Sequence, residues 1–90
     1  MQVNWAPEAE SDLDGIVEFI AADNPFAASN LAETLFETAE KLGQMPYIGR
    51  TGRVAGTREF VAHPNYILVY KVALDELRIL RVLHGSRQYP

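Results

Sequence analysis

The stretch Tyr66-Ile67-Leu68-Val69-Tyr70-Lys71-Val72-Ala73 (residues 66–73) opens with five apolar or aromatic residues in a row. Aromatic and β-branched residues favour strands, and a strand that is apolar on both faces is typical of the centre of a sheet. Strand-like runs lie on either side of it, at residues 58–62 and 77–84, each separated from it by three residues. Connections this short join antiparallel neighbours. The second half of the chain therefore predicts three antiparallel strands with residues 66–73 in the middle.

Two segments around this central strand are less well defined. In residues 77–84 both alternating sides mix aliphatic residues with arginine or histidine, so the pattern does not tell which side faces the rest of the protein. Residues 44–57 contain Pro46 and three glycines. That composition predicts an irregular loop ahead of the strands rather than a regular element.

Two amphipathic helices are predicted in the first half. Apolar residues recur at three- and four-residue spacing from Ala9 to Ile20, after a proline and two acids that favour a helix start, which predicts a helix to about Ala22. Asn24-Pro25 is a second start signal, and a further apolar stripe follows over residues 28–42. A connection of two or three residues makes the helices an antiparallel hairpin whose apolar side needs a surface to cover.

The predicted architecture is α+β. A short extended start at residues 3–5 precedes the helical hairpin, so the order of elements is β-α-α-β-β-β, with an antiparallel sheet packed against the N-terminal hairpin. Ninety residues leave room for one domain, residues 1–90. The chain has no cysteine, which excludes disulfides and thiolate chemistry.

The start of the chain and the distribution of charge limit the possible localisation and partners. The chain opens with Met1-Gln2-Val3-Asn4, without the basic start and apolar stretch of a secretory signal, and no apolar run approaches the roughly 20 residues that span a bilayer. We therefore expect a cytoplasmic protein with no membrane partner. Residues 1–49 hold nine acids and one lysine, and residues 50–90 hold three acids and seven cations, giving formal charges of −8 and +4. A basic surface is where a polyanion or an acidic protein docks, so we expect function in the second half.

Two segments contain residues that could bind an anion or catalyse a reaction. The loop Gly49-Arg50-Thr51-Gly52-Arg53 pairs glycines with two guanidinium groups, which suits an anion, although it matches no phosphate-binding fingerprint; the alternative is a connector with solvated arginines. The tail, residues 84–90, supplies an imidazole, a guanidinium and a phenol, the ingredients for cleaving RNA through its 2′-hydroxyl. The alternative is that His84 closes the last strand and Tyr89 packs against the sheet edge.

Metal and cofactor sites are not expected. The two histidines, His63 and His84, have no third ligand placed with them, so we expect no metal and no cofactor. Acids also alternate along the first predicted helix, but a solvated amphipathic face explains them better than a pair of catalytic carboxylates does.

Several short motifs together resemble the RelE/ParE superfamily of toxins from type II toxin–antitoxin modules, and the ending is closer to the ParE branch. The matching residues cover nearly the whole chain, in the expected order. They are Trp5-Ala6, Asp12-Leu13-Asp14, Gly49-Arg50, Gly56-Thr57-Arg58-Glu59, Asn65 to Tyr70, Ile79 to His84, and Arg87-Gln88.

The resemblance implies a growth-inhibiting toxin that a cognate antitoxin neutralises in a hetero-oligomer. In the ParE branch the target is DNA gyrase, and the toxin binds it without chemistry of its own. The residues expected to face the target are Arg50, Arg53, Arg58, Arg81, His84 and Arg87 as cationic contacts, with Tyr89 as an aromatic anchor. This surface requires that the late arginines gather into one exposed positive zone.

Two alternatives stay open. A RelE-like, ribosome-dependent ribonuclease that cuts messenger RNA would use His84 or Tyr89 as acid or base and Arg58, Arg81 or Arg87 on the phosphate. RelE-type ribonucleases resemble one another in a surface rich in lysine and arginine, whereas this chain has two lysines and a net charge of −4. The other alternative is a non-toxic module that keeps only antitoxin binding.

Overall fold

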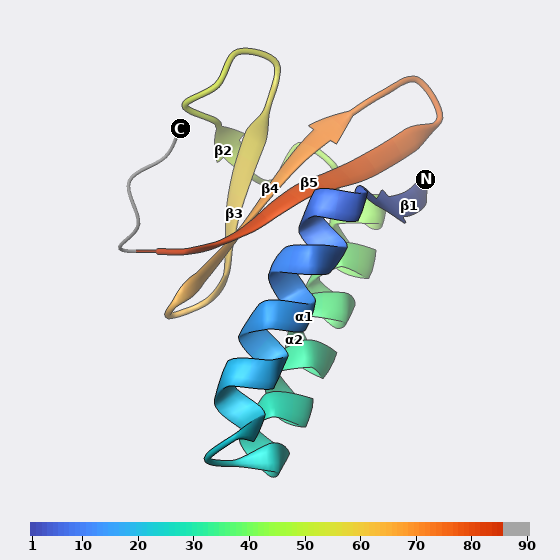
Figure 1. The fold of residues 1–90 in the computed structure, drawn as a ribbon. Coiled ribbons are helices and arrows are strands. Elements are labelled where there is room, and N and C mark those ends of the chain that lie inside the picture. Colours follow the sequence, from blue (N-terminus) through green and yellow to red (C-terminus); the bar gives the residue numbers. More distant parts are fainter. Residues whose placement is uncertain (86–90) are drawn as a thin grey trace.

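The computed structural model describes residues 1–85, which form two helices and one five-stranded sheet (Figure 1). The elements are, in chain order, β1 (Gln2–Trp5), α1 (Pro7–Ala21), α2 (Pro25–Gln44), β2 (Arg50–Thr51), β3 (Arg58–His63), β4 (Tyr66–Val72) and β5 (Glu76–His84). The predicted α+β fold, with its N-terminal helical hairpin followed by strands, is confirmed. Among residues 1–85 no helix is both long and apolar enough to cross a membrane.

The sheet differs from the prediction at its two edges. Its strand order is β1-β5-β4-β3-β2, with β4 in the centre as expected. All neighbours are antiparallel except β1 and β5, which pair in parallel from Gln2 with Glu76 to Trp5 with Ile79, so the sheet is mixed. Residues 50–51 were expected to be irregular, but they form β2 against Arg58 and Glu59. Both edge strands are short. β1 pairs with β5, which is distant in sequence, and β2 pairs with β3 across the loop that joins them, so local sequence patterns do not reveal either edge strand.

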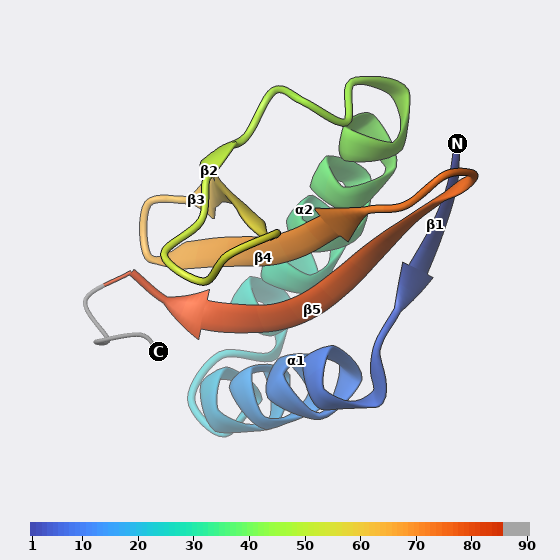
Figure 2. The same ribbon diagram turned by 90° about the horizontal axis from the view of Figure 1, so that it is seen from above.

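Both helices begin as their sequences predict. Pro7 occupies the first turn of α1 with Glu8 and Glu10 beside it, and the side chain of Asn24 accepts a hydrogen bond from the Ala27 N–H (3.1 Å) at the start of α2. The hairpin lies on one face of the sheet, with α1 alongside β5 (Figure 2). The side chains buried between hairpin and sheet include Leu13, Leu31, Leu35, Leu42, Leu68, Tyr70, Leu77, Ile79 and Val82.

A β-bulge in β5 explains why its alternating pattern was ambiguous. Val69 of β4 pairs with Arg81, whereas the next residue, Tyr70, pairs with Ile79, so Leu80 is an extra residue without an opposite partner. One inserted residue exchanges the two faces of the strand. The apolar residues that reach the core therefore change from odd to even positions, with Ile79 before the bulge and Val82 after it.

Candidate functional site

The structure places the expected target-facing residues in separate parts of the molecule. Arg50 lies in β2, Arg53 follows it, Arg58 lies in β3, and Arg81 and His84 lie in β5. Arg87 and Tyr89 lie outside the described residues. Within residues 1–85 three carboxylates of the same chain pair with four of the arginines: Glu59 with Arg50 and Arg53, Glu76 with Arg78, and Asp12 with Arg81.

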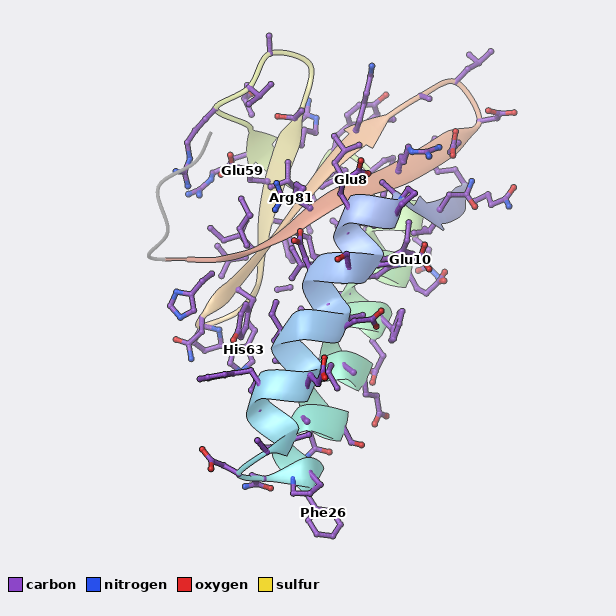
Figure 3. All side chains as sticks on the ribbon, in the orientation of Figure 1. Glu8, Glu10, Phe26, Glu59, His63 and Arg81 are labelled. Atoms are coloured by element: carbon purple, nitrogen blue, oxygen red, sulfur yellow. The ribbon has the colours of Figure 1, made fainter. Side chains whose placement is uncertain are left out.

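Glu59 joins the two arginines of the glycine-rich loop. Its carboxylate accepts a hydrogen bond from Nη2 of Arg50 (3.1 Å) and another from the backbone N–H of Arg53 (3.1 Å), and Nε of Arg53 lies 3.5 Å away. The Glu59 side chain is 2% exposed, whereas the side chains of Arg50 and Arg53 are 59% and 42% exposed. The carboxylate thus lies beneath two guanidinium groups that reach the solvent. Figure 3 labels Glu59 beside β2.

The surroundings of Glu59 keep it ionised. Burial alone raises the pKa of a carboxyl group, but the backbone hydrogen bond from Arg53, the hydrogen bond from Arg50 and the two positive charges outweigh burial. The pKa of Glu59 therefore lies below its usual value of 4.5. Sequence reasoning missed this residue, although it is one of only three acids in the basic half of the chain.

Other contacts of the same loop change the expectation of an anion site. The N–H of Gly49 donates to the hydroxyl of Tyr70 (3.0 Å), and the N–H of Gly52 donates to the carbonyl of Thr57 (2.8 Å). Together with the Arg53 N–H, which donates to Glu59, three backbone donors of the loop are already bonded within the protein. The loop does hold an anion, but that anion is the chain's own carboxylate.

Arg58 is next to Glu59 in sequence but belongs to the other face of the sheet. It pairs in register with Tyr70, a core residue, whereas Glu59 pairs with Val69. Nη1 of Arg58 donates to the carbonyl of Gly49 (2.8 Å), and its guanidinium lies 5.0 Å from the centre of the Tyr47 ring. This cation–π pair includes an aromatic side chain that is 67% exposed, and sequence reasoning had not selected it.

Arg81 is bound to a carboxylate of α1. Its Nε and Nη2 donate to the two carboxylate oxygens of Asp12 at 2.7 and 3.0 Å, a bidentate pair. Asp12 also accepts from the backbone N–H of Val82 (3.0 Å). Because β1 pairs with β5 only as far as Ile79, Asp12 satisfies a backbone donor of β5 just beyond the end of β1. Figure 3 shows Arg81 beside α1.

The two histidines flank one tyrosine where β3 and β5 end and β4 begins. The ring of Tyr66 lies 5.8 Å from His63 and 5.4 Å from His84, the latter edge-to-face. A groove of about 480 Å³ next to them runs between α1 and the sheet, and Phe19, Tyr66 and His84 are among its lining residues. Nδ1 of His63 accepts from the N–H of Asn65 (3.1 Å), so this imidazole stabilises its own turn.

The lowered pKa of Glu59 predicts a specific loss of stability in acid. A depressed carboxyl pKa stabilises the folded state fully above the unfolded value of about 4.5, and this contribution is lost as the pH falls through the folded-state pKa. The free energy of unfolding, measured with urea from pH 6 down to about pH 3, should therefore fall less steeply for Glu59→Gln than for the wild type. Glu8→Gln, at an exposed carboxylate, serves as the control. Identical slopes for the wild type and Glu59→Gln would contradict this assignment.

Comparison with known proteins places the whole chain among bacterial toxins. Residues 3–89 match the family described as the ParE toxin of the type II toxin–antitoxin system parDE. The chain is 36% identical over 86 residues to "Toxin RelE2" of Caulobacter vibrioides, covering 96% of this chain and 97% of that one. It is 34% identical over 90 residues to "Putative toxin Y4kP" of Sinorhizobium fredii, covering 99% and 93%.

A solved structure of a toxin–antitoxin system has a similar fold. The fold matches a chain of the chromosomal ParDE toxin–antitoxin system from P. aeruginosa with a TM-score of 0.85 and 25% identity, covering 93% of this chain and 95% of that one.

Proposed function

The chain belongs to the ParE toxin family of type II toxin–antitoxin systems, and we propose that it inhibits growth by binding DNA gyrase and is neutralised by a cognate antitoxin. The toxin acts by binding alone and cleaves no RNA. It is a single RelE/ParE-like domain that works in the cytoplasm and forms a hetero-oligomer with the antitoxin.

The observation that supports this proposal is the pairing of the arginines with carboxylates of the same chain. A ribonuclease of this kind needs free cationic groups to hold the phosphate and to stabilise the charge that develops during cleavage. Glu59 neutralises part of the charge of Arg50 and Arg53, and Asp12 holds Arg81 in a bidentate pair. A surface with such internally balanced charges is better suited to a protein than to a polyanion.

We propose that the gyrase-facing surface is centred on the β2–β3 edge. Arg50 and Arg53 expose about half of their side chains there, and Arg58 with its exposed partner Tyr47 lies at the same edge. Arginine and tyrosine are enriched among the residues that dominate protein interfaces. Arg81, His84, Arg87 and Tyr89 are the remaining residues expected to contact the target, and Arg87 and Tyr89 lie outside the described residues.

The proposal of an antitoxin partner has support from a relative and from the sheet. The similar chain from P. aeruginosa is part of a ParDE toxin–antitoxin system. In this protein β2 pairs only with Arg58 and Glu59, and no strand of residues 1–85 pairs with the outer edge of β3 beyond them. An unpaired strand edge accepts an extended segment of another chain.

Two assays on the purified protein test the proposed function. We expect inhibition of gyrase-catalysed supercoiling and no cleavage of messenger RNA on programmed ribosomes. Messenger cleavage that disappears in His84→Ala or Tyr89→Phe would contradict the proposal and support the ribonuclease alternative, with Arg58, Arg81 or Arg87 on the phosphate. Inactivity in both assays, with normal growth of cells that express the protein, would indicate a non-toxic module that keeps only antitoxin binding.

A further inference from the structure

We propose that Glu59 is a specificity determinant that prevents the Arg50–Arg53 pair from binding RNA and so reserves this face of the sheet for a protein target. The inference rests on the proposed function, because it explains how a toxin of this fold avoids a polyanion. Specificity for one partner is obtained by weakening the competing partner as well as by favouring the right one.

Glu59 lies on the face of the sheet that does not pack against the helices. In β3 its neighbour Phe60 packs against the core, and Glu59 pairs in register with Val69, which lies outside the core cluster. Since successive side chains of a strand point to opposite faces, Glu59 belongs to the face of the sheet away from the helices. Arg50 lies opposite it in β2 and shares that face. The carboxylate is therefore at the base of the basic surface that this face presents at its β2 edge.

Glu59 also lowers the net positive charge of the Arg50–Arg53 pair. Two guanidinium groups carry two positive charges, and the buried carboxylate between them removes one. A phosphate that approached from solvent would meet two guanidinium groups that are already paired with Glu59, through Nη2 of Arg50 at 3.1 Å and Nε of Arg53 at 3.5 Å. It would also bring a second negative charge close to a buried one, where repulsion is screened less than at the surface. RNA carries such a charge at every nucleotide, whereas a protein partner can place a single acidic side chain, or a neutral one, against the exposed guanidinium groups.

Three backbone donors of the loop are already bonded within the protein. Backbone N–H groups often complete a phosphate site, but those of Gly49, Gly52 and Arg53 donate to Tyr70, Thr57 and Glu59. The Arg53 N–H and the Arg50 guanidinium converge on one carboxylate, an arrangement in which an oxyanion is bound. Glu59 fills this position from inside the protein, so that removing its charge should leave the positive charges of Arg50 and Arg53 available to an external oxyanion.

The test is binding of a short single-stranded oligouridylate to the purified toxin over a range of salt concentrations. We expect weak binding by the wild type. Glu59→Gln, which keeps the shape of the side chain, should bind about five- to tenfold more tightly at low salt, with a slope of log K against log salt that is steeper by about 0.7–1.4, or one to two phosphates. Adding Arg53→Gln to this variant should reverse most of the gain.

Glu76→Gln is the matched control. It changes the net charge by the same amount and releases Arg78, whose Nη1 lies 3.5 Å from Glu76 at the other end of the sheet. We expect no more than a twofold change in RNA affinity. An equal gain in Glu76→Gln and Glu59→Gln would mean that only the total charge matters, and no gain in Glu59→Gln would show that Glu59 does not suppress RNA binding. Either result overturns the inference.

A second measurement on the wild type covers the case in which Glu59→Gln does not fold. The side-chain Nε–Hε resonances of Arg50 and Arg53 should not shift when oligouridylate is added to the isotope-labelled toxin, and a shift of both would overturn the inference. Because RNA binding is measured with the toxin alone, these results can be read whether or not the wild type inhibits gyrase. Failure of the gyrase proposal is therefore recognised separately.

Discussion

Tyr70→Ala is expected to destabilise the toxin by about 3–5 kcal/mol, a large part of the stability of a 90-residue domain. Tyr70 is the largest of the fully buried side chains, in the central strand of the sheet. Its hydroxyl donates to the carbonyl of Pro46 (2.8 Å) and accepts from the N–H of Gly49 (3.0 Å). Truncation would leave a cavity and release the segment that connects α2 to β2. Urea unfolding followed by circular dichroism measures the loss.

The contribution of the Tyr70 hydroxyl to stability can be measured separately from that of the ring. Tyr70→Phe keeps the packing but leaves the Gly49 N–H and the Pro46 carbonyl without their partner, which should cost about 1–3 kcal/mol. Burial raises the pKa of the Tyr70 hydroxyl, so it keeps the proton that it donates well above neutral pH. Tyr47→Phe, at an exposed tyrosine nearby, should change stability by less than about 0.5 kcal/mol. Equal effects of the two Tyr→Phe substitutions would contradict the role given to this hydroxyl.

The backbone at Gly49 agrees with the contacts assigned to the Tyr70 hydroxyl. A Cβ atom at Gly49 would lie 2.5 Å from the Tyr70 hydroxyl oxygen and 2.9 Å from the carbonyl oxygen of Glu59. Glycine at this position therefore lets the segment approach both groups closely. The hydrogen bond from Gly49 to Tyr70 keeps Arg50, the next residue, at the edge of the sheet, where its guanidinium donates to Glu59.

Asp12→Ala is expected to destabilise the toxin by about 2–3 kcal/mol. The substitution removes two hydrogen bonds to the Arg81 guanidinium and leaves the backbone N–H of Val82 without its acceptor. The cost stays below the roughly 3–5 kcal/mol of a fully buried broken ion pair, because the Arg81 side chain is 36% exposed and water can replace part of the lost contact.

Asp14→Ala is the control for this prediction. Asp14 lies in the same helix but is exposed, and we expect a change within about 0.5 kcal/mol. The double variant Asp12→Ala/Arg81→Ala should be less destabilised than the sum of its single variants, since the ion pair is lost only once. Additive single effects would show that the two residues do not stabilise each other.

The regular elements were predictable because each has its own local signal. The apolar run of β4 identified the centre of the sheet, and Asn24-Pro25 identified the break between the helices. What escaped prediction depends on pairs far apart in sequence. Trp5 pairs with Ile79, and Asp12 accepts from Arg81, 69 residues later. The bulge at Leu80 also escaped, because one inserted residue leaves a mixed pattern on both faces.

The ion pairs of the basic residues could not be predicted from the sequence. The separation of charge along the chain favoured one positive surface in the second half. In the folded protein the acids of one half meet the bases of the other, as Asp12 meets Arg81. Within the second half, Glu59 is the acid that pairs with Arg50 and Arg53. Charge counted along a sequence therefore says little about which guanidinium groups remain available, because that is set by packing.

A binding titration of the purified toxin against gyrase and against ribosomes in one buffer measures directly whether this toxin recognises a protein and not RNA. We predict saturable binding to gyrase that weakens little as salt is raised to physiological strength, and no saturable binding to ribosomes. Saturable, steeply salt-dependent binding to ribosomes with none to gyrase would show that gyrase is not the target and that the toxin does recognise RNA.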